Sequence, residues 1–192
     1  MAEKKALIIA AGSAELAGSG PGLEKLLKKA AVFTSFAASG AVDAGLEAQA
    51  VRLQPAEVEG AMEKDLGVGF IDLGTADTAA LDAALTTILD AVDRKTVIAV
   101  AAKNTLAFYG LGINAKAGSL ERAASARDVV PTLAYIADIP ITSACDGAIL
   151  YQALKSPNLK LEEIGKLKEA LMRMEGALAR DNREPWDKHD CA

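Results

Sequence analysis

Short apolar runs alternate with amphipathic segments along most of this chain, and this alternation restricts the folds that it can adopt. Residues 6–11, 68–73 and 96–101 are three such runs, and each is too short to form a buried helix. They are predicted to be strands that are buried on both faces. Segment 75–92 has apolar residues three or four positions apart, as in a helix with one buried face. Strands that alternate with helices predict an α/β protein, a three-layer α/β/α sandwich with a mostly parallel sheet.

Further segments complete this predicted sandwich. Residues 31–36 and 105–111 are expected to be strands because they combine aromatic and β-branched side chains. Additional helices are predicted at residues 23–29, 40–53, 56–66, 128–137 and 146–154. A chain of 192 residues can bury roughly 70% of the surface that it exposes when unfolded. Residues 1–158 are therefore expected to form one α/β core.

A different pattern occupies residues 161–180, where apolar side chains recur every three or four positions with charged residues between them. We expect a long amphipathic helix over residues 159–182, followed by a flexible tail over residues 183–192. The apolar stripe either packs on the chain's own domain or forms the interface of a homodimer. We predict the homodimer, with an interface made of Leu161, Ile164, Leu167, Leu171, Met174 and Leu178.

The composition excludes several classes of function. The net charge is −5, so the chain has no general attraction for nucleic acids or anionic membranes. One histidine, His189, and two cysteines, Cys145 and Cys191, cannot supply a multi-histidine metal site, a four-cysteine zinc site or a disulfide framework. Neither a signal peptide nor a membrane-spanning run is indicated, so the expected location is the cytoplasm.

Three segments follow one another over residues 105–154. The first reads Thr-Leu-Ala-Phe-Tyr-Gly-Leu-Gly-Ile-Asn-Ala-Lys-Ala-Gly (105–118), and the second reads Asp-Val-Val-Pro-Thr-Leu-Ala-Tyr-Ile-Ala-Asp-Ile-Pro (128–140). The third is Asp146-Gly147 with Leu150 and Leu154 after it. In content and order, these segments resemble the alkaline-phosphatase-like superfamily, which includes sulfatases and phosphopentomutases. The resemblance implies the core of that superfamily's sandwich fold.

The resemblance also implies a chemistry, which uses two divalent cations held by Asp and His beside a Ser, Thr or formylglycine nucleophile. Where an Asp would follow the first strand, this chain has Ala10 and Ala11. Where Asp-His-Gly would follow the strand at 96–101, residues 101–104 read Ala-Ala-Lys-Asn. We therefore predict a non-catalytic member of the superfamily, a pseudoenzyme that acts by binding or assembly and needs no cofactor.

Five polar residues remain candidates for a ligand site, and four of them also have a simpler structural explanation. Asp72 and Asp77 lie at a strand end and a helix start, where they would cap a turn and the helix. Asp43 lies near the position expected for a nucleophile, and Lys103 and Asn104 replace the lost ligands but also suit a tight turn. One alternative is a Mg²⁺-dependent phosphoryl hydrolase or transferase that uses the three carboxylates. The other is a sensor that binds a small anion or nucleotide.

Overall fold

The computed structural model describes residues 4–38, 40–46, 50–64, 66–142, 145–156 and 159–181, with the backbone alone described at 159–163 and 180–181. The chain divides into two compact units, Met1–Lys155 and Ser156–Ala192. The predicted tail at 183–192, with His189 and Cys191, lies outside the described residues.

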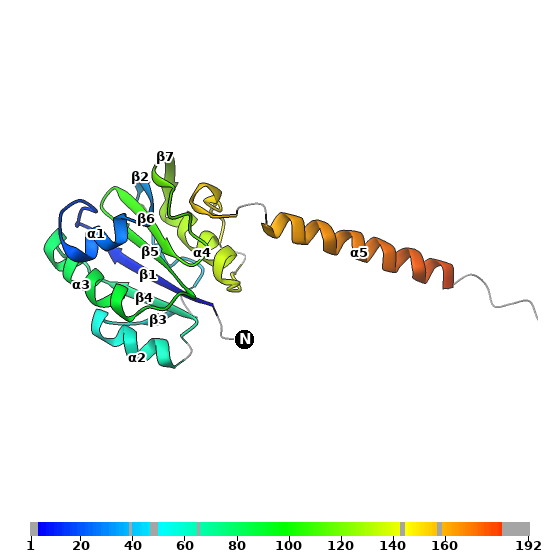
Figure 1. The fold of residues 1–192 in the computed structure, drawn as a ribbon, viewed down its shortest axis with the longest axis horizontal. Coiled ribbons are helices and arrows are strands. Elements are labelled where there is room, and N and C mark those ends of the chain that lie inside the picture. Colours follow the sequence, from blue (N-terminus) through cyan, green and yellow to red (C-terminus); the bar gives the residue numbers. More distant parts are fainter. Residues whose placement is uncertain are drawn as a thin grey trace, which may run out of the picture. The chain divides into compact units, whose positions relative to one another are not determined.

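The first unit is built on a seven-stranded sheet with the order β3-β4-β1-β5-β6-β2-β7 (Figure 1). Strand β6 pairs antiparallel with β5 and β2, and all the other pairings are parallel. This arrangement confirms the mostly parallel sheet that the sequence predicts. The strands are β1 (Lys5–Ala11), β2 (Ala31–Ala37), β3 (Ala50–Arg52), β4 (Val68–Asp72), β5 (Thr96–Ala102), β6 (Thr105–Gly110) and β7 (Gly118–Ser125).

Helices cover both faces of this sheet, which confirms the three-layer sandwich (Figure 1). On one face, side chains of α1, α2 and α3 form a core with Leu7 and Ile9 of β1. On the other face, side chains of α4 form a core with Ile8 of β1 and with Phe33 and Phe108, whose rings meet edge to face. The helices are α1 (Pro21–Leu27), α2 (Val58–Glu63), α3 (Thr78–Ala91) and α4 (Val129–Ala137) in this unit, and α5 (Leu159–Asp181) in the second.

The helix predicted at residues 40–53 is wrong. Residues 40–46 form turns, in which Gly40 and Gly45 have φ values of +102° and +92°. Residues 50–52 form strand β3, which pairs in parallel with β4 along Val68–Phe70. A side chain period of two cannot be recognised over three residues, and the hydrogen bonds that hold this edge strand come from its neighbour.

The short helix predicted at residues 146–154 is also wrong, because this segment is extended except for a 3₁₀ turn at Tyr151–Ala153. Two of its backbone N–H groups donate to side chains at the start of α4. The Ala148 N–H donates to Asp128 Oδ1 at 2.7 Å, and the Leu150 N–H donates to Thr132 Oγ1 at 3.0 Å. In a helix, these two N–H groups would donate to backbone carbonyl groups. Here side-chain oxygens accept their hydrogen bonds instead. Strand β7 was not predicted either, because most of its residues are exposed and only Leu120 is large and apolar.

Gly147 is the residue that allows this segment to approach the 3₁₀ turn at Ala126–Asp128, just before α4, so closely. A Cβ atom at position 147 would overlap the backbone carbonyl group of Arg127. Gly147→Ala is therefore expected to lower the free energy of unfolding by about 2 kcal/mol or more, because backbone must move to admit the methyl group. Urea denaturation of the whole chain measures this change.

Gly60→Ala is the matched control, because apart from its chain neighbours and the helix's own backbone no atom lies within 4 Å of a Cβ built at this position in α2. It should leave the free energy of unfolding unchanged or raise it by up to about 1 kcal/mol. Equal stability of the two variants would contradict the close packing of the 145–150 segment.

Candidate functional site

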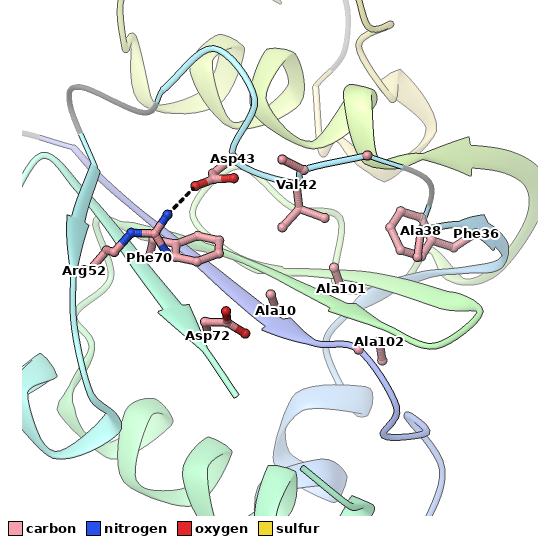
Figure 2. Close-up of a pocket in the computed structure, with 13 residues that line it drawn as sticks. Ala10, Phe36, Ala38, Val42, Asp43, Arg52, Phe70, Asp72, Ala101 and Ala102 are labelled. Atoms are coloured by element: carbon pink, nitrogen blue, oxygen red, sulfur yellow. Dashed lines mark hydrogen bonds and ion pairs between the residues drawn. The ribbon is translucent and has the colours of Figure 1, made fainter. Parts of the chain in front are cut away.

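The carboxyl ends of three neighbouring strands meet at one edge of the sheet. In the parallel register, Ala10 of β1 pairs with Asp72 of β4 on one side and with Ala101 of β5 on the other. These three residues therefore form a row across the sheet, and their side chains point to the same face. A cavity of about 320 Å³ lies over this row, and Figure 2 shows the residues around it. Its lining also includes Phe36, Val42, Asp43, Arg52, Phe70 and Ala102.

An ion pair lies at one side of this pocket. Asp43, from the turns at 40–46, is buried, and its Oδ2 lies 3.4 Å from Nη2 of Arg52 on β3. The Arg52 guanidinium is 4.8 Å from the centre of the Phe70 ring, which gives it a cation–π contact (Figure 2). The Arg52 side chain is 71% exposed, so one end of the pair is open to solvent. The arrangement places a guanidinium at the pocket, where it is supported by a ring and a carboxylate.

Asp72 supplies the second carboxylate of the pocket. Its Oδ1 accepts a hydrogen bond of 2.8 Å from the Gly74 N–H, which closes the turn after β4. The turn role that the sequence suggested is therefore present, and the residue lines the pocket as well. Asp72 is exposed, so its charge is available to a ligand.

The structure does not bring the other three candidates to the pocket lining. Asp77 caps α3, where its Oδ1 accepts a hydrogen bond of 2.8 Å from the Ala80 N–H. Lys103 and Asn104 form the two-residue turn between β5 and β6. The Lys103 Nζ lies 3.4 Å from Glu15 Oε1, in an exposed pair. These three residues have structural roles of the kind that their positions in the sequence suggested.

Sequence reasoning missed Arg52, Phe70 and Phe36 as residues of the site. The sequence predicts a helix over residues 40–53. In that helix, Arg52 would not lie beside the strand ends where the ligand site is expected. Its role depends on the pairing of β3 with β4, which places Arg52 opposite Phe70 in the register. No local pattern marks that neighbourhood in the sequence. Arg52 could have been assigned to the pocket only if residues 50–52 had been recognised as a strand that pairs with β4.

The pocket residues do not fit the paired metal centre that the resemblance implies. Within the described parts of the chain, no group of three or more His, Cys, Asp or Glu side chains is placed to hold a metal ion. Asp43 is already paired with Arg52, whose positive charge repels a cation, and Asp77 caps a helix. Ala10 and Ala101 contribute only methyl groups at the positions beside Asp72.

Cys145 has the properties of a structural residue rather than of a nucleophile. Burial raises the pKa of the Cys145 thiol, and the negative charge of Asp146 shifts it in the same direction. The thiol therefore stays protonated near neutral pH, whereas nucleophilic attack requires the thiolate. Its Cβ lies close to Gly45, where a side chain would find little room.

Comparisons with protein-family models, with curated proteins and with solved structures find no match to this chain. Among the described helices, none has the length and apolar character needed to cross a membrane. What the pocket binds is therefore inferred from its own side chains. These provide two aromatic rings, one guanidinium, two carboxylates and a floor of small residues.

The ion pair in the pocket predicts how two substitutions combine. Arg52→Ala leaves the buried Asp43 carboxylate without its cation, so it should lower the free energy of unfolding by about 1 kcal/mol. Adding Asp43→Asn to this variant should recover most of the loss, because the neutral amide costs less to bury. Urea denaturation of the two single variants and the double variant measures the coupling.

Lys103→Ala is the control, since it removes an exposed pair and should change the free energy of unfolding by less than about 0.5 kcal/mol. Additive effects of Arg52→Ala and Asp43→Asn would show that the two side chains do not interact.

Proposed function

We propose that this chain is a non-catalytic relative of the alkaline-phosphatase-like superfamily, and that it binds a small organic molecule in the pocket at the carboxyl edge of its sheet. One observation carries the proposal: the row of Asp72, Ala10 and Ala101 across three neighbouring strands lies under the cavity. Ligands in parallel α/β sheets bind outside the carboxyl ends of the strands, which is where this cavity lies.

The two alanines support the non-catalytic part of the proposal. The resemblance implies metal ligands after the first strand and after the strand that is now β5. Ala10 and Ala101 occupy these strand ends, and their methyl groups cannot bind a cation. Two-metal hydrolysis needs several carboxylates and imidazoles around each ion. Asp72 alone cannot replace that set of metal ligands, and the Asp43 carboxylate already forms an ion pair with Arg52.

The side chains of the pocket suit a particular class of ligand. Phe36, Phe70 and Val42 provide an apolar surface that packs against a hydrocarbon or planar group. Arg52 has five N–H donors, and Asp43 engages it through Nη2, so the guanidinium can also bind an anionic group. Asp72 accepts hydrogen bonds from a hydroxyl or ammonium group. The proposed ligand therefore has an apolar body, an acidic group and a hydrogen-bond donor.

A thermal-shift screen with aromatic carboxylates, sugar phosphates and nucleoside monophosphates tests the binding part. A ligand that binds the folded state raises the melting temperature by mass action. At least one compound should raise the melting temperature of the unmodified chain, and Arg52→Ala should lose that shift. Lys103→Ala should keep it, since Lys103 lies outside the pocket lining. Binding that is insensitive to Arg52→Ala, or no binding at all, would reject this pocket as the site.

Assays with p-nitrophenyl phosphate and p-nitrophenyl sulfate in the presence of Mg²⁺, Mn²⁺ or Zn²⁺ test the non-catalytic part. No turnover above the metal-free background is expected. Metal-dependent turnover that disappears in Asp72→Ala would overturn it and favour the Mg²⁺-dependent enzyme. The cytoplasmic location expected from the sequence belongs to the same proposal and is tested by cell fractionation.

Ala10→Asp tests the correspondence between this pocket and the implied metal site. The new carboxylate would lie beside Asp72 in the register, so the two like charges should lower the melting temperature without metal. Mn²⁺ should then raise the melting temperature of this variant by a few degrees, because two adjacent carboxylates provide two ligands. The unmodified chain and the neutral variant Ala10→Asn should show no such rise. The same response in Ala10→Asn and Ala10→Asp would contradict the correspondence.

A further inference from the structure

The pocket at the carboxyl edge of the sheet carries a negative charge that no neighbouring cation balances. Among the described residues that line it, three are charged: Asp43, Arg52 and Asp72. Asp43 and Arg52 neutralise each other in their ion pair. Asp72 accepts a hydrogen bond from the Gly74 N–H, but it forms no ion pair with any cation in the described parts of the chain. The Asp72 carboxylate is therefore the charge that a ligand can neutralise.

Asp72 lies on the same face of the sheet as the ion pair. Arg52 of β3 is opposite Phe70 of β4 in the register, and Asp72 is two residues further along β4. Alternate residues of a strand point to the same face, and two residues span roughly 7 Å along the strand. Figure 2 shows the Asp72 carboxylate on the side of the sheet that carries the pair. A ligand with two polar groups close together can therefore reach the guanidinium and Asp72 at once.

The charge of Asp72 acts against ligands whose only charged group is an acid. An acid that binds Arg52 brings a second negative charge close to Asp72, and like charges at short range repel each other. A phosphate ester carries up to two negative charges near neutral pH, so it meets a larger repulsion. An ammonium group on the same ligand offsets this cost, because it forms a charge-assisted hydrogen bond with Asp72.

The size of the pocket restricts the ligand further. Its volume of about 320 Å³ is near the lower end of the range of roughly 300–1,000 Å³ that is usual for ligand pockets. Phe36, Val42 and Ala101 make one part of the lining apolar. A small molecule with one ammonium group, one acidic group and an apolar group matches these features better than a nucleotide does.

We propose that the ligand is a free amino acid with an apolar side chain. Its carboxylate binds N–H groups of Arg52 that Asp43 does not engage, and its ammonium group binds Asp72. Its side chain packs on the apolar lining at Phe36 and Val42. This inference rests on the proposed function, because it assigns a class of ligand to the same pocket. It specifies that the hydrogen-bond donor of that ligand is a cation.

Calorimetric titration of the full chain with matched ligands tests the inference. L-phenylalanine and L-leucine are compared with the acids that lack the amino group, 3-phenylpropionate and 4-methylpentanoate. At least one amino acid should bind, and about tenfold more tightly than its matched acid, since the ammonium group adds a hydrogen bond between charged groups. The amines without a carboxylate, phenethylamine and 3-methylbutylamine, should also bind more weakly, because they leave the Arg52 donors unused.

Asp72→Asn separates the charge of Asp72 from its role in the turn. The Asn side chain keeps an oxygen that can accept from the Gly74 N–H, but it has no charge. The variant should bind the amino acids about tenfold more weakly and the simple acids as tightly as before or more tightly. A distorted pocket would instead weaken both kinds of ligand. Asp77→Asn is the matched control, because Asp77 accepts a similar backbone hydrogen bond outside the pocket lining, and it should change neither affinity.

The possible results distinguish this inference from the function on which it rests. Simple acids that bind through Arg52 as tightly as the amino acids would overturn the inference and leave the pocket as a binding site. Amino acids that bind equally well to Asp72→Asn and to the unmodified chain would have the same meaning. If none of the six ligands binds, the inference fails, and the thermal-shift screen decides separately whether the pocket binds another acid. Binding that is unaffected by Arg52→Ala would overturn both proposals.

Discussion

The parallel pairing of β1 with β4 on one side and with β5 on the other positions the rest of the first unit. Leu7, Ile8 and Ile9 of β1 are fully buried, and alternate residues face the two helical layers. Each such side chain contributes about 1.5–3 kcal/mol when it leaves water. The register of these three strands fixes which residues share the carboxyl edge of the sheet. The pocket lies at this edge because the strands end there together.

The chemistry of the pocket follows from which residues occupy these ends. Two of the three residues in the row are alanines, and the third is Asp72, which also closes a turn. The charged pair of Asp43 and Arg52 comes from segments outside these strands. A site of this composition can hold a molecule through apolar contact and charge, but it gathers few groups for acid–base or metal chemistry. The binding role that we propose rests on these apolar and charged groups.

The segments that carry the family resemblance have clear structural roles. Asp128 accepts hydrogen bonds from the N–H groups of Ser125 and Ala148, and so joins the end of β7 to the 145–150 segment. Thr132, one turn into α4, accepts another from Leu150. Gly147 allows the close approach between these segments. These residues join the end of β7, the start of α4 and the 145–150 segment to one another.

The sequence alone predicted strands β1, β2, β4, β5 and β6 and helices α1 to α5, because each contains an apolar run or a helical spacing that can be recognised locally. It also excluded a multi-histidine site, since composition does not depend on the fold. Tertiary structure decided the rest. Strand β3 and the 145–150 segment are held by hydrogen bonds to residues that are distant in the sequence. Such bonds cannot be predicted from the local secondary-structure propensities of the residues. Arg52 meets Asp43 and Phe70 because the sheet order brings β3 beside β4.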